Sequence, residues 1–304
     1  MNSKTLLYIV KRLLLAVLTV WVVITVTFFA TRAVPGGPFA SEKAITPAAK
    51  AALEAKYGLD KPVLEQYTTY LKDIVLHFDF GPSLKQRGRQ VIDVKTSAKL
   101  GVIAAFASLI CGVVLGAIAA LRRNKVIDRV IMVITTAFVS MPSFIMGSLM
   151  LVAFSIKLAI LPANGSTTEG LILPVITLAL YPTAYITRLT RSSMLDVLGQ
   201  DYIRTAKAKG VPGKRIIFGH ALKNSLIPVI TYFGPMLAYI VTGSLVVEQI
   251  FAVPGIGRAF VNSIINRDYP LIMGTTIVLA ALIVIMNLVG DILYKVVDPR
   301  INLE

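Results

Sequence analysis

The chain has 304 residues, of which 56% are hydrophobic and only 15% are charged, whereas a soluble domain is about one quarter charged. This balance excludes an ordinary soluble protein, so the net charge of +15 reports on membrane orientation before it suggests any ligand. We therefore expect a polytopic membrane protein with no nucleic-acid partner. With one cysteine and two histidines in the chain, no disulfide framework, metal site or histidine-based catalytic site is expected.

Six uncharged stretches are long enough to cross a bilayer, which requires about 20 mostly apolar residues. They are Leu13–Ala30, Leu100–Leu121, Val130–Ile156, Leu171–Thr187, Asn224–Val247 and Leu271–Gly290. The first is interpreted as an uncleaved anchor, because it is long for a signal peptide and no small-residue cleavage site follows it. The sequence thus predicts an all-α membrane protein with six transmembrane helices.

The short loops between these stretches differ strongly in basic residues. The termini and loops on one side hold 17 Lys and Arg residues, and the short loops on the other side hold three. The positive-inside rule then places both termini in the cytoplasm. We predict three regions: residues 1–30 with the first span, an extracytoplasmic helical loop at 31–99, and a core at 100–304 with a cytoplasmic loop at about 196–223.

The extracytoplasmic loop contains two predicted helices. Thr46-Pro47 starts a helix that Gly58 ends, and Asp60-Lys61-Pro62 starts another, before a turn at Asp79–Ser83. Apolar and aromatic side chains recur along the second helix at three- and four-residue intervals, which predicts one common face. These residues are Val63, Leu64, Tyr67, Tyr70, Leu71, Ile74 and Val75. The face packs on the protein's own bundle or forms a docking surface for an external partner.

Prolines occur within several predicted spans. They are Pro142, Pro174, Pro182, Pro228 and Pro235. Each removes a backbone hydrogen bond and tends to kink its helix, which suits a bundle that opens and closes, although proline is also simply common in transmembrane helices. In the last outward loop, Pro254-Gly255-Ile256-Gly257 is interpreted as a turn that precedes a short amphipathic stretch.

The most basic segment of the chain is Asp201–Pro228, here called the basic loop. Asp201 is expected to cap a helix at Tyr202–Lys209, and Gly210 suits the left-handed position after its end. Pro212-Gly213 then breaks the chain before a second helix that runs to about Leu222.

The first helix of the basic loop carries candidate docking residues. Ala206 and Gly210 are four residues apart, so they share a face on which the backbone of another protein can approach closely. Arg204, Lys207 and Lys209 suit an acidic or polar partner, or they serve only the positive-inside bias.

Several kinds of chemistry are missing from the sequence. No charged residue lies near a span centre, which disfavours an ion-coupled carrier, and no hydrolase motif is present. Gly213-Lys214 is followed by Arg215 where a phosphate-binding loop needs Ser or Thr, so the chain is not expected to bind ATP. A transporter-like bundle that lacks its own energy source points to docking on a separate ATPase.

Several ordered motifs resemble those of one known family. Tyr202–Gly210, followed by His220–Asn224 and Pro228, is similar to the coupling loop of binding-protein-dependent ABC importers, in the form found in dipeptide/oligopeptide permeases. Other stretches resemble the B-type permease subunit of that group along nearly the whole chain. They are Ala33–Phe39, Asp79–Ser83, Thr242–Ser244, Pro254–Gly257, Asn266–Pro270 and Asp298–Arg300.

The resemblance implies a permease subunit in a bacterial inner membrane that moves peptides and is not an enzyme. It implies four kinds of partner: a second similar permease, two cytoplasmic ATPase subunits that bind ATP and Mg, an extracytoplasmic binding protein, and the peptide. It assigns ATPase docking to Tyr202, Arg204, Thr205, Ala206, Lys207, Lys209 and Gly210.

In this chain Arg204-Thr205-Ala206 stands where the general importer pattern has Glu-Ala-Ala. A Glu-based contact with the ATPase therefore does not carry over to this chain. Three alternatives remain at this stage: a permease for nickel or another metal chelate, an ion-coupled carrier, and a sensor-like scaffold that uses the outer loop for recognition.

Overall fold

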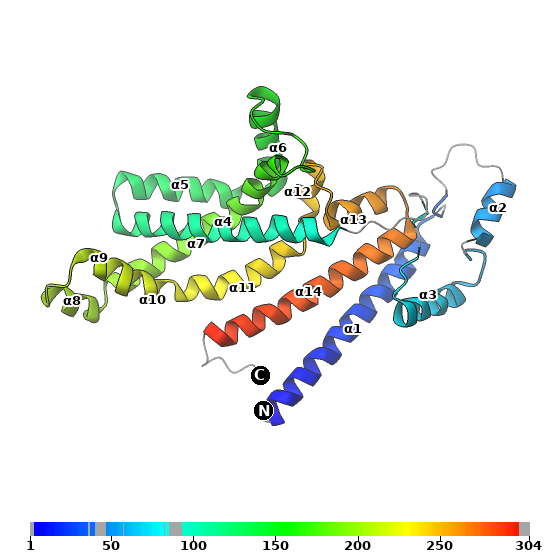
Figure 1. The fold of residues 1–304 in the computed structure, drawn as a ribbon, viewed down its shortest axis with the longest axis horizontal. Coiled ribbons are helices and arrows are strands. Elements are labelled where there is room, and N and C mark those ends of the chain that lie inside the picture. Colours follow the sequence, from blue (N-terminus) through cyan, green and yellow to red (C-terminus); the bar gives the residue numbers. More distant parts are fainter. Residues whose placement is uncertain are drawn as a thin grey trace. The chain divides into compact units, whose positions relative to one another are not determined.

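The computed structural model describes residues 3–35, 37–39, 47–56, 58–81, 83–84 and 93–297. Every regular element among these residues is a helix (Figure 1), which agrees with the predicted all-α class. The chain forms two compact units, one of residues 1–92 with 258–282 and the other of 93–257 with 283–304. Thr46, Pro82 and Asp298–Arg300, all named in the sequence predictions, lie outside the described residues.

Five helical stretches are long and apolar enough to cross a membrane. They are Val10–Ala33, Val94–Leu121, Glu169–Leu198, Ile227–Ile250 and Tyr269–Val289. A sixth candidate consists of Val126–Ser140 and Ser143–Lys157, which are bent by 108° relative to each other. Six spans therefore result, as predicted, when the bent pair is counted as one span.

The prediction of a continuous third span was wrong. α5 (Val126–Ser140) ends before Met141, and α6 (Ser143–Met150) starts after Pro142 and continues into a π-helical segment, Leu151–Lys157. Proline has no backbone N–H and disfavours the helical conformation in the residue before it. Met141 is accordingly extended, with φ −90° and ψ 127°.

The larger unit is built around α4 (Val94–Leu121). This helix packs along α7 (Ile172–Leu198) and α11 (Ile227–Val241), and the three lie side by side in Figure 1. A Cβ atom on Gly101 would lie 2.6 Å from the Ile240 carbonyl oxygen, and one on Gly116 would lie 2.6 Å from that of Thr187. The absence of side chains at these glycines permits backbone-to-backbone packing, which is a common means of helix association in membranes.

Hydrogen bonds from polar side chains fix the first turns of two helices in this unit. The Asp93 carboxylate accepts hydrogen bonds from the Thr96 amide (3.0 Å) and hydroxyl (2.6 Å), which caps α4 and lowers the pKa of Asp93. Arg191 on α7 donates from Nε and Nη2 to the two carboxylate oxygens of Asp128, at 2.6 and 2.7 Å. This two-point pair fixes the start of α5 against α7.

A second core of the same unit lies around α12 (Leu245–Ile250) and the short 3₁₀ helix Glu169–Leu171. Its buried members are Leu100, Leu171, Leu173, Val247, Phe251 and Val253. The basic loop of this unit contains four short helical segments. They are α8 (Asp201–Ala208), α9 (Gly213–Arg215), the π-helix Ile216–Leu222 and α10 (Lys223–Ser225).

The smaller unit contains α1 (Ser3–Ala33), α2 (Pro47–Lys56), α3 (Val63–His77) and the first part of α14 (Tyr269–Val297). α13 (Ile256–Ile265) begins just before the boundary between the units. The core brings together α1, α3 and α14 through Ile24, Phe28, Ile74, Met273 and Ile277. Gly58, two positions after the last residue of α2, has a positive φ of 63°, in agreement with its predicted position at the helix end.

The predicted apolar face of α3 is correct only in its middle. Tyr67, Tyr70, Leu71 and Ile74 join the core with α1 and α14, so this helix packs on its own bundle. Leu64 and Val75, by contrast, are 70% and 69% exposed. Leu64 lies in the first turn of the helix, and Val75 points about 100° away from Ile74, so neither reaches the core.

Two segments that carried the family resemblance meet in this unit. The Ser83 hydroxyl and the Leu84 amide both donate hydrogen bonds to the carboxylate of Asp268, the latter at 3.1 Å. Gly81, at φ 81°, would bring a Cβ atom to 3.4 Å from the Cβ of Pro270. The predicted turn at Asp79–Ser83 is therefore held by a contact with a distant segment that the sequence did not reveal.

Candidate functional site

The basic loop follows α7 after only two residues, Gly199 and Gln200. α8 begins at Asp201 with Gln200 at the N-cap, which makes no side-chain capping bond. The prediction that Asp201 caps this helix was therefore wrong by one position. The helix ends at Ala208, and Gly210 adopts a φ of 75°, the left-handed conformation predicted for it.

The predicted docking residues lie mainly on the surface of α8 and the turn after it. Ile203 is fully buried and Ala206 is half-buried. Tyr202, Arg204, Thr205, Lys207, Lys209 and Gly210 are exposed. A Cβ atom on Gly210 would meet nothing within 4 Å. Because α8 ends before Gly210, Ala206 and Gly210 do not form one continuous helical face; Gly210 instead leaves an open backbone surface beside the helix.

The inner side of the basic loop is anchored on α4 and α7. Ala221 is buried in a small core with Ala120 of α4 and Met194 of α7. Within the loop, the Tyr202 hydroxyl accepts a hydrogen bond of 2.9 Å from the side-chain nitrogen Nδ2 of Asn224. A cleft of about 420 Å³ lies beside these contacts, where Lys207 and Gly213 face Leu198 and Leu121. The loop is thus attached along one side and open along the other.

A larger cavity of the same unit, here called the tyrosine cavity, has a volume of about 670 Å³. It lies where α5 and α6 are bent apart, and α7 and α11 complete its wall. Three of the span prolines line it, namely Pro142, Pro182 and Pro235. From the sequence alone, these prolines either serve a path or are simply common in membrane helices. The structure groups the three around one space.

The lining of the tyrosine cavity is apolar with a few polar groups. Tyr181, Tyr232 and Tyr239 contribute hydroxyls, and the buried Thr177 hydroxyl has no hydrogen-bond partner among the described residues. Tyr239 is 82% exposed and Tyr181 is 51% exposed. An apolar wall with scattered hydroxyls suits varied side chains and a peptide backbone, because it offers hydrogen bonds without a fixed charge. None of these tyrosines was predicted from the sequence.

A buried carboxyl group lies beyond the C-terminal end of α11, in the short helix α12. Glu248 has no exposed surface; its carboxylate accepts a hydrogen bond of 2.8 Å from the Ser97 hydroxyl and another of 2.8 Å from the Gly257 amide. The Ser97 hydroxyl in turn accepts one of 2.9 Å from the Ile256 amide. We call Ser97, Gly243, Glu248, Gly255 and Gly257 the Glu248 cradle. The segment at Gly255, interpreted from sequence as a turn, thus also encloses an ionisable side chain.

The described fold and site together define a polytopic helical membrane protein with an exposed basic loop and a cavity that is partly open. The chain matches the family model "Binding-protein-dependent transport system inner membrane component" over residues 112–303. It also matches "Binding-prot-dependent transport system membrane comp, N-term" over residues 5–86.

Curated relatives match along almost the whole chain. The chain is 46% identical to the dipeptide transport system permease protein DppB of Bacillus subtilis, with 98% of each chain covered. It is 44% identical to the oligopeptide transport system permease protein OppB of Salmonella typhimurium and 40% identical to DppB of Lactococcus lactis subsp. cremoris, with 97% of this chain and 99% of each relative covered. The chain belongs to the family of inner-membrane components of binding-protein-dependent transport systems. It is a multi-pass permease subunit, not an enzyme, which confirms the predicted class.

Proposed function

We propose that this permease subunit carries short peptides across a bacterial inner membrane in an ATP-driven importer. The proposal is supported by the names of its full-length relatives, which are dipeptide and oligopeptide permeases, and by the uncharged, hydroxyl-bearing wall of the tyrosine cavity. Both favour peptides over a nickel or other metal chelate.

The assembly contains a second, similar permease subunit, two ATPase subunits that bind ATP and Mg, and an extracytoplasmic binding protein that delivers the peptide. Both termini and the basic loop face the cytoplasm, because the basic residues of the short loops lie overwhelmingly on that side. The exposed Tyr181 and Tyr239 then face the second permease, so that the tyrosine cavity becomes part of a shared path.

The observation that carries the proposal is the position of α7. This helix lines the tyrosine cavity with Tyr181 and Pro182 and ends at Leu198, two residues before α8. The distance from Pro182 to Leu198 is about 24 Å of helix. A helix transmits displacement along its axis, so movement of α8 by an ATPase reaches the cavity wall. ATP and loaded binding protein each act by favouring one of the two conformations.

Within the basic loop, Gly210 is the residue whose docking role is easiest to test. We expect Gly210→Trp to insert and assemble normally but to stop ATP-driven peptide uptake, because an indole would occupy the open surface beside α8. Gly210→Ala is the matched control: it imposes the same backbone strain and adds only one methyl group. Uptake is measured in vesicles that contain all subunits, and assembly is measured by co-purification of the ATPase subunits.

Normal uptake by Gly210→Trp would refute docking at this surface. Loss of uptake by both variants would assign the defect to the backbone conformation instead. Uptake of a nickel chelate with no uptake of peptides would decide for the alternative cargo.

A further inference from the structure

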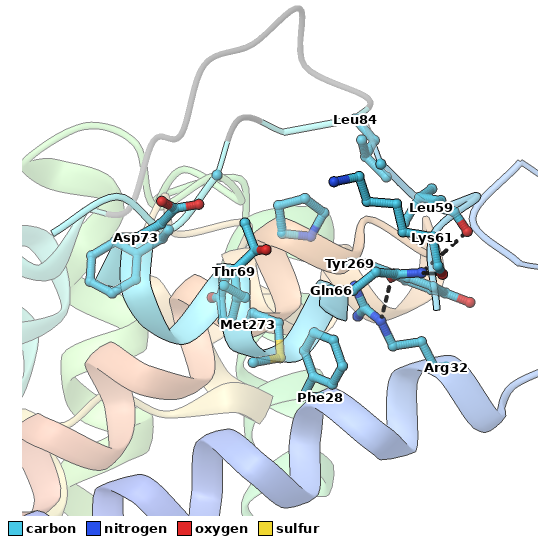
Figure 2. Close-up of a pocket in the computed structure, with 15 residues that line it drawn as sticks. Phe28, Arg32, Leu59, Lys61, Gln66, Thr69, Asp73, Leu84, Tyr269 and Met273 are labelled. Carbon is cyan, nitrogen blue, oxygen red and sulfur yellow. Dashed lines mark hydrogen bonds between the residues drawn. The ribbon is translucent and has the colours of Figure 1, made fainter. Parts of the chain in front are cut away.

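The smaller unit contains its own cavity, of about 240 Å³, which we call the Arg32 pocket (Figure 2). Phe28 and Arg32 of α1 form one wall. Gln66, Tyr70 and Asp73 of α3 form another, and Tyr269 at the start of α14 completes it. No role in docking or in the proposed peptide path requires this cavity.

Arg32 enters the pocket with most of its hydrogen-bonding capacity unused. Its Nε donates to Gln66 Oε1 at 3.2 Å and its Nη1 to the Thr31 hydroxyl at 3.3 Å. The guanidinium carbon lies 3.7 Å from the centroid of the Phe28 ring, which holds the cation by its π face and leaves the edge free. A guanidinium has five N–H donors, and no carboxylate among the described residues forms an ion pair with Arg32.

Two tyrosines that line the same pocket, Tyr70 and Tyr269, carry hydroxyls without partners. The hydroxyls of Tyr70 and Tyr269 are buried with no hydrogen-bond partner among the described residues, and Tyr269 is only 5% exposed. Burial raises the pKa of Tyr70, so its hydroxyl remains a donor at neutral pH. Buried polar groups normally form hydrogen bonds, so we expect these two hydroxyls to donate to an acceptor. The cavity is thus lined by one cation and by two tyrosines whose hydroxyls lack an acceptor, and this set of donors favours an anionic ligand.

The remaining charges of the pocket restrict that anion. Lys61 is already paired with Glu65 at 2.7 Å. Asp73 also lines the pocket, about 10 Å along α3 from Gln66, and Figure 2 shows it well separated from Arg32. Among the described residues of the pocket, Arg32 is the one cation without an ion-pair partner, and the pocket also contains the Asp73 carboxylate. This balance favours a singly charged ligand over a doubly charged phosphate. A planar carboxylate matches the edge of a guanidinium, with which it forms two parallel hydrogen bonds.

We propose that the Arg32 pocket binds the C-terminal carboxylate of a peptide. This inference rests on the proposed function and adds a binding site to it. At 240 Å³ the pocket is smaller than the about 300–1,000 Å³ of sites that enclose drug-sized ligands, so it holds the end of a chain and not a whole oligopeptide. The terminal carboxylate is common to linear peptides of every sequence, so this contact retains a peptide without selecting its side chains.

The test measures binding of trialanine and of trialanine amide to the purified full-length chain in lipid nanodiscs, by ligand-observed NMR. We expect trialanine to bind at least about 10-fold more tightly than the amide, and Arg32→Gln to remove this difference. Tyr269→Phe should weaken trialanine binding about threefold to tenfold, through the loss of one donor. Lys61→Gln is the matched control: it removes a cation of the same pocket that already has a partner, and it should change the affinity less than twofold. Arg32→Lys, which keeps the charge, should retain part of the preference if Arg32→Gln proves unstable.

Equal binding of the acid and the amide would overturn the proposal, as would equal effects of Arg32→Gln and Lys61→Gln. Acetate should displace trialanine. Displacement by inorganic phosphate alone would overturn the proposal in favour of a phosphate or lipid-headgroup site. Because binding is measured without ATPase subunits, failure here with intact ATP-driven peptide uptake would refute this site and leave the proposed function standing.

Discussion

The basic loop and the Glu248 cradle both adjoin helices of the larger unit, and both are rich in glycine, yet they use it in opposite ways. In the basic loop, a Cβ atom on Gly210 or Gly213 would meet nothing within 4 Å. In the cradle, a Cβ atom on Gly255 would overlap Ser97 Oγ and Glu248 Oε2, and would lie 2.7 Å from Glu248 Cδ. The basic loop leaves open space beside Gly210 and Gly213, whereas the cradle fills the space beside Gly255.

The difference teaches that glycine content does not by itself distinguish an exposed loop, here the proposed docking surface, from a closely packed contact between segments. The cradle encloses a carboxylate with no exposed surface, whereas the Asp201 carboxylate in the basic loop is 96% exposed and only 3.5 Å from the Arg204 guanidinium. Substitutions in the cradle should therefore affect folding, and substitutions in the basic loop should affect coupling. Three experiments sharpen this contrast.

The largest effect is expected for Gly255→Val. The added side chain must displace Ser97 or Glu248 from their hydrogen bonds, and such overpacking should cost about 3 kcal/mol. Gly213→Val is the matched control, since neither position has a positive φ and Gly213 has open space around it. The measurement is the thermal unfolding midpoint of the purified chain in detergent; equal midpoints for the two variants would show that the cradle is not closely packed.

A smaller loss is expected for Glu248→Gln. The amide that replaces one carboxylate oxygen cannot accept the bond from Ser97 or from the Gly257 amide, so one buried donor loses its partner, at about 2 kcal/mol. Asp201→Asn removes a carboxylate charge from the basic loop and should change stability by less than about 0.5 kcal/mol, because exposed ion pairs contribute little. If both variants unfold at the same temperature, burial of Glu248 has no energetic consequence.

The smallest of the three effects is expected for Gly210→Ala. An alanine in the left-handed conformation should cost about 1 kcal/mol, with no clash, since the space around Gly210 is open. Gly213→Ala, at a position without a positive φ, should be close to neutral. A loss at Gly210 no greater than at Gly213 would indicate that the turn after α8 relaxes to another conformation.

Much of the fold was predictable because local signals act over a few residues. Runs of apolar residues located the spans, and Gly58 and Gly210 marked helix ends that need a positive φ. Errors arose where the local signal was ambiguous. Pro142 was expected to kink a span, and it separates two helices bent by 108°. The apolar residues Leu64 and Val75 matched the helical period of α3 but lie beyond its contact with α1.

The candidate sites differ in the same way: a site made of neighbouring residues was predictable from the sequence, and a site made of distant segments was not. The docking residues of the basic loop were contiguous, so a motif could identify them, although their role remains a prediction. The tyrosine cavity and the Arg32 pocket could not be found in this way, because their residues come from separate segments. Pro142, Pro182 and Pro235 were noticed singly, and nothing in the sequence indicated that they line one space.

By itself, the sequence determined the membrane class, the spans and the family, because hydropathy, charge bias and ordered motifs are properties of contiguous residues. Only the tertiary structure decided which polar groups lose access to water. Glu248 was assigned to an outward loop and is buried with Ser97, 151 residues away in the chain. Arg32 falls in the predicted extracytoplasmic loop at 31–99 and lies in a pocket with Tyr70 and Tyr269. Burial depends on which distant segments pack together, and for a polar group that packing sets both its partners and the cost of lacking one.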